Sequence, residues 1–110
     1  MGREVYRYSF SPAVPMAEAE ESLLLAVLAA ESLHGQSRVR MDASYCVDAD
    51  RRACVIDATS RVGRDICRIF TGFALREFGE DAFKVRRVED VPSVPQPACA
   101  ASAAGREVTA

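Results

Sequence analysis

Residues 16–34 constrain the fold more than any other part of the chain. This segment is rich in Ala, Leu and Glu, which favour helix. Pro15 suits the first turn of a helix, and Gly35 suits the position just after its end. A long helix with an apolar side to pack on a sheet is therefore predicted, its apolar stripe being Leu23, Leu24, Val27, Leu28 and Ala30.

Alternating polar and apolar residues predict strands on both sides of this helix. Residues 4–10 place Tyr6, Tyr8 and Phe10 on one face. Residues 38–48 alternate over a longer stretch and predict a second strand, which a turn connects to a third strand over residues 52–59.

The turn between these two strands fixes how they pair. Loops of two or four residues keep the apolar faces of both strands on one side of the sheet. The four-residue loop also keeps Asp42 from lying directly opposite Asp57, a repulsive pair, and we favour it.

A second helix and a last strand complete the pattern. Thr59 and Ser60 are candidate N-caps of a helix that ends before Gly79, and residues 83–88 predict the final strand. Gly63 and Gly72 each cost this helix about 1 kcal/mol relative to Ala. We expect Gly72 to permit a close approach of neighbouring backbone.

The order strand–helix–strand–strand–helix–strand is that of the ferredoxin-like split βαββαβ fold, an α+β class. Right-handed crossovers place the first and third strands in the centre of a four-stranded antiparallel sheet, with two helices on one face. We expect residues 3–88 to form this domain and residues 89–110, which are rich in Pro and Ala, to form a flexible tail.

Composition narrows the classes of partner. The net charge is -2, and residues 1–88 carry as many basic as acidic side chains, so there is no bulk attraction to nucleic acid or anionic lipid. The apolar block 23–30 is too short to span a bilayer, and no secretory leader is visible. We expect a cytoplasmic protein without a membrane association.

The uncovered sheet face is the first candidate site. We expect a non-enzymatic module that self-associates or docks on a larger protein through this face and the edge strands. RNA binding there is a weaker alternative, because the central strands lack the aromatic side chains on which RNA-recognition domains stack bases. The predicted interface residues are Val5, Arg7, Arg38, Arg40, Val55, Arg86 and Val88.

The start of the second helix is the alternative candidate site. Free N–H groups at a helix start, with Arg side chains nearby, suit a phosphate or carboxylate. Such a site would make the protein a sensor or enzyme for a small anionic ligand. The spacing lacks the glycines and the lysine of a phosphate-binding loop. The candidate residues are Thr59, Ser60, Arg61, Gly63, Arg64 and Arg68.

Catalytic and metal chemistry have little support in the sequence. The four cysteines form no CxxC pair and His34 is the only histidine, so we expect no metal, no cofactor and no disulfide. Cys54 and Cys67 fall on predicted core faces, whereas Cys99 lies in the tail as a candidate reactive or cross-linking thiol. No catalytic residue is assigned.

Overall fold

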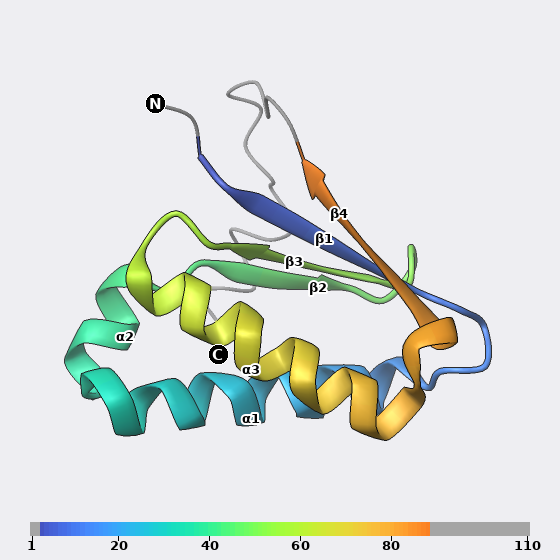
Figure 1. Ribbon diagram of the computed structural model, residues 1–110, viewed down its shortest axis with the longest axis horizontal. Coiled ribbons are helices and arrows are strands. Elements are labelled where there is room, and N and C mark those ends of the chain that lie inside the picture. The colour runs from blue at the N-terminus through green and yellow to red at the C-terminus, as the bar shows by residue number, and fades with distance from the viewer. Residues whose placement is uncertain (1–2, 89–110) are drawn as a thin grey trace.

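Four antiparallel strands and three packed helices make up an α+β domain in the computed structural model, which describes residues 3–88 (Figure 1). The predicted tail, residues 89–110, lies outside the described residues. The elements follow the order β1 (Val5–Phe10), α1 (Met16–His34), α2 (Gln36–Asp42), β2 (Tyr45–Asp48), β3 (Ala53–Asp57), α3 (Arg61–Phe78), a short 3-10 turn η1 (Glu80–Ala82) and β4 (Phe83–Val88).

The sheet has the strand order β2-β3-β1-β4, so the prediction that β1 and β3 are central is confirmed. Asp48 pairs with Ala53 across the β2–β3 hairpin, which leaves residues 49–52 as the loop. The predicted four-residue loop is therefore confirmed. A shift of the β2–β3 pairing by one residue is disfavoured, because it would turn the inward-facing side chains of the shifted strand outward.

Helix α2 corrects the predicted long second strand. Residues 36–42 are helical, and the strand begins only at Tyr45. The reason is the length of its partner, because β3 ends at Asp57, whose N–H already donates to the carbonyl of Ser44. Residues before Ser44 thus have no strand to pair with. A helix instead satisfies their backbone groups and buries Val39, while Met41 stays exposed.

The core lies between the sheet and the helices. Tyr8 and Phe10 of β1 point toward α3, as predicted, and the ring of Tyr8 packs edge-on against Phe70 with centroids 4.9 Å apart. Leu23 of α1 is fully buried in this core. The predicted apolar stripe of α1 is wider than the part of the helix that packs against the core, however, since Leu24 and Leu28 are 44% and 57% exposed.

Arg52 joins the hairpin loop to the connection between β1 and α1. It is the only described non-glycine residue with a positive φ, 53°. Its guanidinium donates to the carbonyl oxygens of Ser11 and Val14, and its own carbonyl accepts from the N–H of Phe10. These hydrogen bonds hold the backbone of Arg52 in a conformation that is uncommon for residues other than glycine.

Gly63, not Gly72, is the glycine that permits a close approach. A Cβ built at Gly63 would lie 1.9 Å from the carbonyl oxygen of Asp57, whereas one built at Gly72 would meet nothing within 4 Å. The first turn of α3 therefore packs directly against the backbone at the end of β3. Any side chain at position 63 would have to displace one of these two elements.

Candidate interaction surface

All three helices lie on one face of the sheet, and no described helix covers the other face, which we call the outer face (Figure 1). Strand alternation sends Tyr6, Tyr8 and Phe10 toward the helices and the intervening residues of β1 outward. The register then places three rows of side chains across the outer face. The first row, from β2 to β4, is Asp48, Ala53, Ser9 and Lys84. The second row, in the same order, is Cys46, Val55, Arg7 and Arg86. The third row begins on β3 and is Asp57, Val5 and Val88.

Five of the seven predicted interface residues meet on this face. Arg7 lies directly between Val55 and Arg86, and Val5 lies beside Val88. Alternation along the strands was the signal that identified them.

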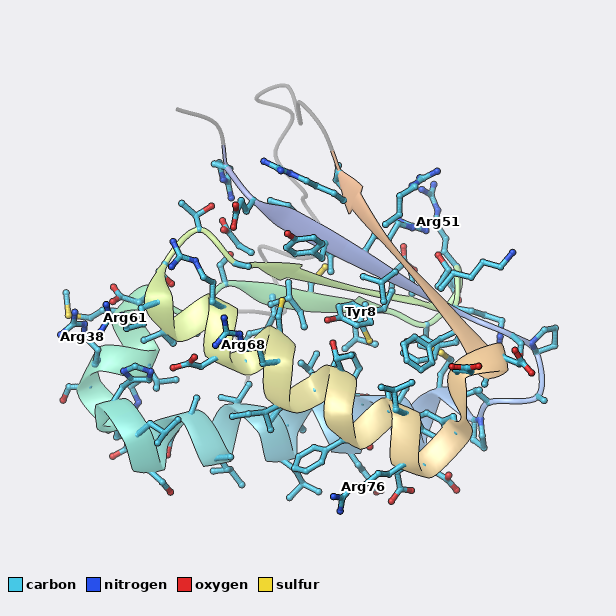
Figure 2. All side chains as sticks on the ribbon, viewed as in Figure 1. Tyr8, Arg38, Arg51, Arg61, Arg68 and Arg76 are labelled. Atoms are coloured by element: carbon cyan, nitrogen blue, oxygen red, sulfur yellow. The ribbon has the colours of Figure 1, made fainter. Side chains whose placement is uncertain are left out.

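Arg38 and Arg40 do not belong to the outer face, and their inclusion was wrong. Both are on α2 because the predicted strand is helical there. Arg38 lies with Arg61 at the end of the molecule formed by α2 and the start of α3 (Figure 2). Its guanidinium contacts Asp42 one turn away, Nε to Oδ2 at 3.0 Å.

The outer face is polarised by charge. On its β2 side it carries Asp48, and on its β4 side it carries Lys84 and Arg86. Between these edges the two central strands carry four small or apolar side chains and two charged ones, Arg7 and Asp57. The edge cations on β4 also discourage unspecific pairing of that strand with another chain.

Three residues on this face are buried apart from the main core. Val5, Cys46 and Ala53 are at most 6% exposed, yet they do not belong to the cluster between sheet and helices. Sequence alternation predicted the outward direction of Val5 and Ala53 but not their burial.

The start of α3 brings the predicted anion-site residues together but uses their polar groups internally. The hydroxyl of Ser60 accepts from the N–H of Gly63 at 3.0 Å, a side-chain N-cap. The hydroxyl of Thr59 accepts from the N–H of Glu4 at 2.9 Å, and Arg64 Nε lies 4.0 Å from the carboxylate of Glu4. Arg61 and Arg68 are exposed on the first two turns of the same helix.

Asp57 anchors the chain just before this helix. Its carboxylate accepts from the N–H of Thr59 at 2.8 Å and from the Arg3 guanidinium at 2.6 Å. Burial by itself would raise the pKa of Asp57, but these hydrogen bonds from Thr59 and Arg3 together outweigh it and lower the pKa. The fold therefore favours the ionised carboxylate.

The only histidine pairs with an acid rather than standing alone at a helix end. His34 Nε2 lies 2.7 Å from Asp65 Oδ2, which links the end of α1 to α3. Within residues 3–88, no three His, Cys, Asp or Glu side chains converge as a metal site. No helix in this part of the chain is long and apolar enough to cross a membrane.

The cysteines fall into two environments. Cys54 and Cys67 are free thiols buried in the core. Burial, helped by the Glu20 carboxylate, raises the pKa of Cys54 to about 12, and burial raises that of Cys67 to about 11. Cys46 lies on the outer face and is disulfide-bonded, which corrects the expectation of no disulfide.

No protein-family model, curated protein or solved structure shows significant similarity to this chain.

Proposed function

We propose that this domain is a non-enzymatic assembly module that binds a second copy of itself through the outer face. The observation that carries the proposal is the opposite charge of the two ends of one row of that face, with Lys84 at one end and Asp48 at the other. The Asp48 carboxylate also lies 3.9 Å from the exposed guanidinium of Arg51 in the hairpin loop, a contact that the second copy's Lys84 would have to compete with. Small and apolar side chains lie between Asp48 and Lys84. Two copies of such a surface have complementary charges when one copy is rotated by 180° relative to the other.

A two-fold axis parallel to the strands produces that complementarity. Such an axis lays β2 of one copy over β4 of the other and keeps each row opposite the same row. Asp48 then faces Lys84 of the second copy, twice per dimer, and in the middle row Arg7 faces Val55 of the second copy. Aligned packing of two sheets is a common arrangement, with side chains of both faces interdigitating.

Charge reversal tests this arrangement on the full chain under reducing conditions. Asp48→Lys and Lys84→Glu alone each place like charges opposite one another, whereas the double variant restores both pairs with their signs exchanged. Exposed pairs contribute about 0.2–1 kcal/mol each, so two reversed pairs should weaken dimerisation about tenfold. Arg76→Glu, on α3 and away from the sheet, is the matched control (Figure 2).

Light scattering gives the measurement, since a dimer has twice the monomer mass of 12.0 kDa. We expect dimers for the wild type, Arg76→Glu and the double variant, and a shift toward monomer for each single reversal. A double variant weaker than both singles would exclude this geometry. A wild-type monomer at every concentration would exclude self-association.

A dimer that ignores these reversals but dissociates with Leu28→Glu would place the interface on α1 instead. Leu24, Leu25 and Leu28 expose apolar surface on the outer side of that helix. That outcome would also overturn the proposal for the sheet.

The two alternative functions have weaker support. The N–H of Gly63 and the side chain of Arg64 at the start of α3 already have partners within the chain, so an anion would have to displace them. RNA binding lacks a stacking platform, because the described residues of the outer face include no aromatic side chain.

We further propose that the domain is a ferredoxin-like fold with one added helix. The βαββαβ core, the strand order and the position of the helices on one face support this assignment. Helix α2 is the addition, and it extends the first crossover between β1 and β2.

A further inference from the structure

We propose that β4 binds an extended, acidic segment of a partner protein as an additional strand of the sheet. The segment pairs antiparallel with the edge of β4 that faces away from β1, over residues 83–86, which we call the β4 edge. Its acidic side chains alternate with apolar ones. The inference does not rest on the proposed function, because the dimer uses the outer face of the sheet and this segment uses its edge.

The pairing of β4 with β1 leaves alternate backbone groups of β4 unused. β4 is last in the strand order and has β1 as its only described neighbour (Figure 1). The N–H of Ser11 donates to the carbonyl oxygen of Ala82, which sets the hydrogen-bonded positions of the β1–β4 ladder. Bonded and non-bonded pairs alternate along an antiparallel ladder, so Phe83 and Val85 direct their N–H and C=O groups away from β1. An added strand would find these groups at the β4 edge.

Val85 provides an apolar contact at this edge. Its cross-strand partner Tyr8 points toward the helices, and Val85 therefore lies on the helix side of the sheet. Val85 is nevertheless 44% exposed, so the core is incompletely covered there. An apolar side chain opposite Val85 on an added strand would extend the core by one strand.

Lys84 and Arg86 favour an acidic occupant. Both side chains are exposed and point to the outer side of the sheet, two residues apart. Neither forms an ion pair with another residue of the described range 3–88. The preceding acidic side chains, Glu80 and Asp81, belong to η1 and not to the strand. Carboxylates on the outer side of an added strand would lie opposite these two cations and stabilise the pairing.

The same two cations disfavour a second β4 at this edge. Residues directly opposite in a sheet lie on the same side of it, so two antiparallel β4 strands related by a two-fold axis pair in registers centred on a residue. Centring on Lys84 or Arg86 places that residue against itself, and centring on Val85 places Lys84 against Arg86. Like charges directly opposite are destabilising. The β4 edge therefore suits an acidic strand better than a second copy.

Peptide binding to the full chain, followed by fluorescence anisotropy at low salt, tests the charge requirement. The probe is a fluorescein-labelled heptapeptide of alternating Val and Glu. Its Val residues would lie opposite Phe83 and Val85, and its Glu residues opposite Lys84 and Arg86. We expect this peptide to bind, and the same peptide with Lys in place of Glu to bind at least about tenfold more weakly. Equal binding of the two peptides would overturn the proposal.

N-methylation of the probe tests the backbone pairing without a change in the protein. In the antiparallel arrangement the N–H groups of the Val residues face β4, whereas those of the Glu residues point away from it. Methyl groups on the Val nitrogens should weaken binding about tenfold, and methyl groups on the Glu nitrogens should have little effect. An equal loss for both peptides, or a larger loss for the Glu-methylated one, would overturn the antiparallel pairing.

Val85→Pro tests the same hydrogen bond from the side of the protein. Pro removes the N–H that faces away from β1, is tolerated on edge strands and leaves every charge in place. Val85→Ala keeps this N–H and is the matched control. We expect the Pro variant to bind the probe at least about fivefold more weakly than the Ala variant, with unchanged circular dichroism. Equal binding by the two folded variants would overturn the pairing at Val85, and the methylated probes decide the question if the Pro variant does not fold.

Light scattering on the same proteins separates this inference from the proposed function. Val85→Pro should have the mass of the wild type, because the outer face is unchanged. If the probe binds but no form dimerises, the proposed function fails and the edge site stands. If the wild type dimerises but does not bind the probe, the edge site fails and the proposed function stands.

Discussion

Replacement of Gly63 by Ala tests the packing of α3 on β3 most directly. The added Cβ would lie 1.9 Å from the Asp57 carbonyl oxygen and 3.1 Å from the Cα of Ala58. Both are backbone atoms, so no side-chain rotation can relieve the overlap. Either the end of β3 or the first turns of α3 must move.

The expected magnitude follows from two opposing effects. Overpacking costs about 1–3 kcal/mol, and the severity of this overlap places it near the upper limit. Ala gains about 1 kcal/mol over Gly in a helix. The net loss in the free energy of unfolding is therefore about 2 kcal/mol, or about 8–16 °C in Tm for a domain of this size.

Gly72→Ala is the matched control in the same helix. Gly72 is exposed, and a Cβ there meets nothing within 4 Å. The helix preference then acts alone and should stabilise the domain by about 1 kcal/mol, or about 4–8 °C in Tm.

Urea unfolding followed by circular dichroism measures both variants on the full chain. The two substitutions are chemically identical, so an opposite sign can come only from the surroundings of each glycine. A Gly63→Ala variant as stable as the wild type, or a shift in the same direction for both variants, would refute the proposed contact.

Three further outcomes are expected. Tyr8→Phe removes a buried hydroxyl that lies 2.7 Å from Thr71 Oγ1 and should cost about 1 kcal/mol in urea unfolding; a neutral substitution would contradict a structural role for this hydrogen bond. In the reduced native chain at pH 8, iodoacetamide should alkylate Cys54 and Cys67 far more slowly than after unfolding, because burial raises their pKa to about 12 and about 11; peptide masses give the rates, and equal rates would contradict the burial. The lowered pKa of Asp57 stabilises the fold at pH values above the unfolded pKa of about 3.9, and this contribution is lost as the pH falls through the lower folded value. The stability difference between wild type and Asp57→Asn should thus be largest near neutral pH and shrink in acid, and a difference independent of pH would contradict it.

Much of the candidate site was predictable because a strand alternates its side chains with a period of two. Once Tyr8 and Phe10 were assigned to the core, the outward direction of Arg7 and its neighbours followed. The same rule failed for Arg38 and Arg40, because it applies only where residues are extended. Alternation over residues 38–42 is a local pattern, and local patterns do not reveal whether a partner strand is present.

The sequence by itself determined the elements whose causes are local. Helix α1 between Pro15 and Gly35, an N-cap at Thr59 or Ser60 and the four-residue loop of the hairpin depend on caps, turns and periodicity. The structure then selected Ser60 as the N-cap. Chain order together with the handedness of crossovers then fixed the order of the strands in the sheet.

Only the tertiary structure decided the features that depend on residues distant in the chain. Helix α2 exists because β3 ends at Asp57, and Gly63 is required because α3 approaches that same strand end. The guanidinium of Arg52 holds the hairpin on the connection that follows β1. Each of these features is a contact between segments that are distant in the sequence. No short stretch of sequence determines how close two such segments lie, because their distance depends on the packing of all the elements together.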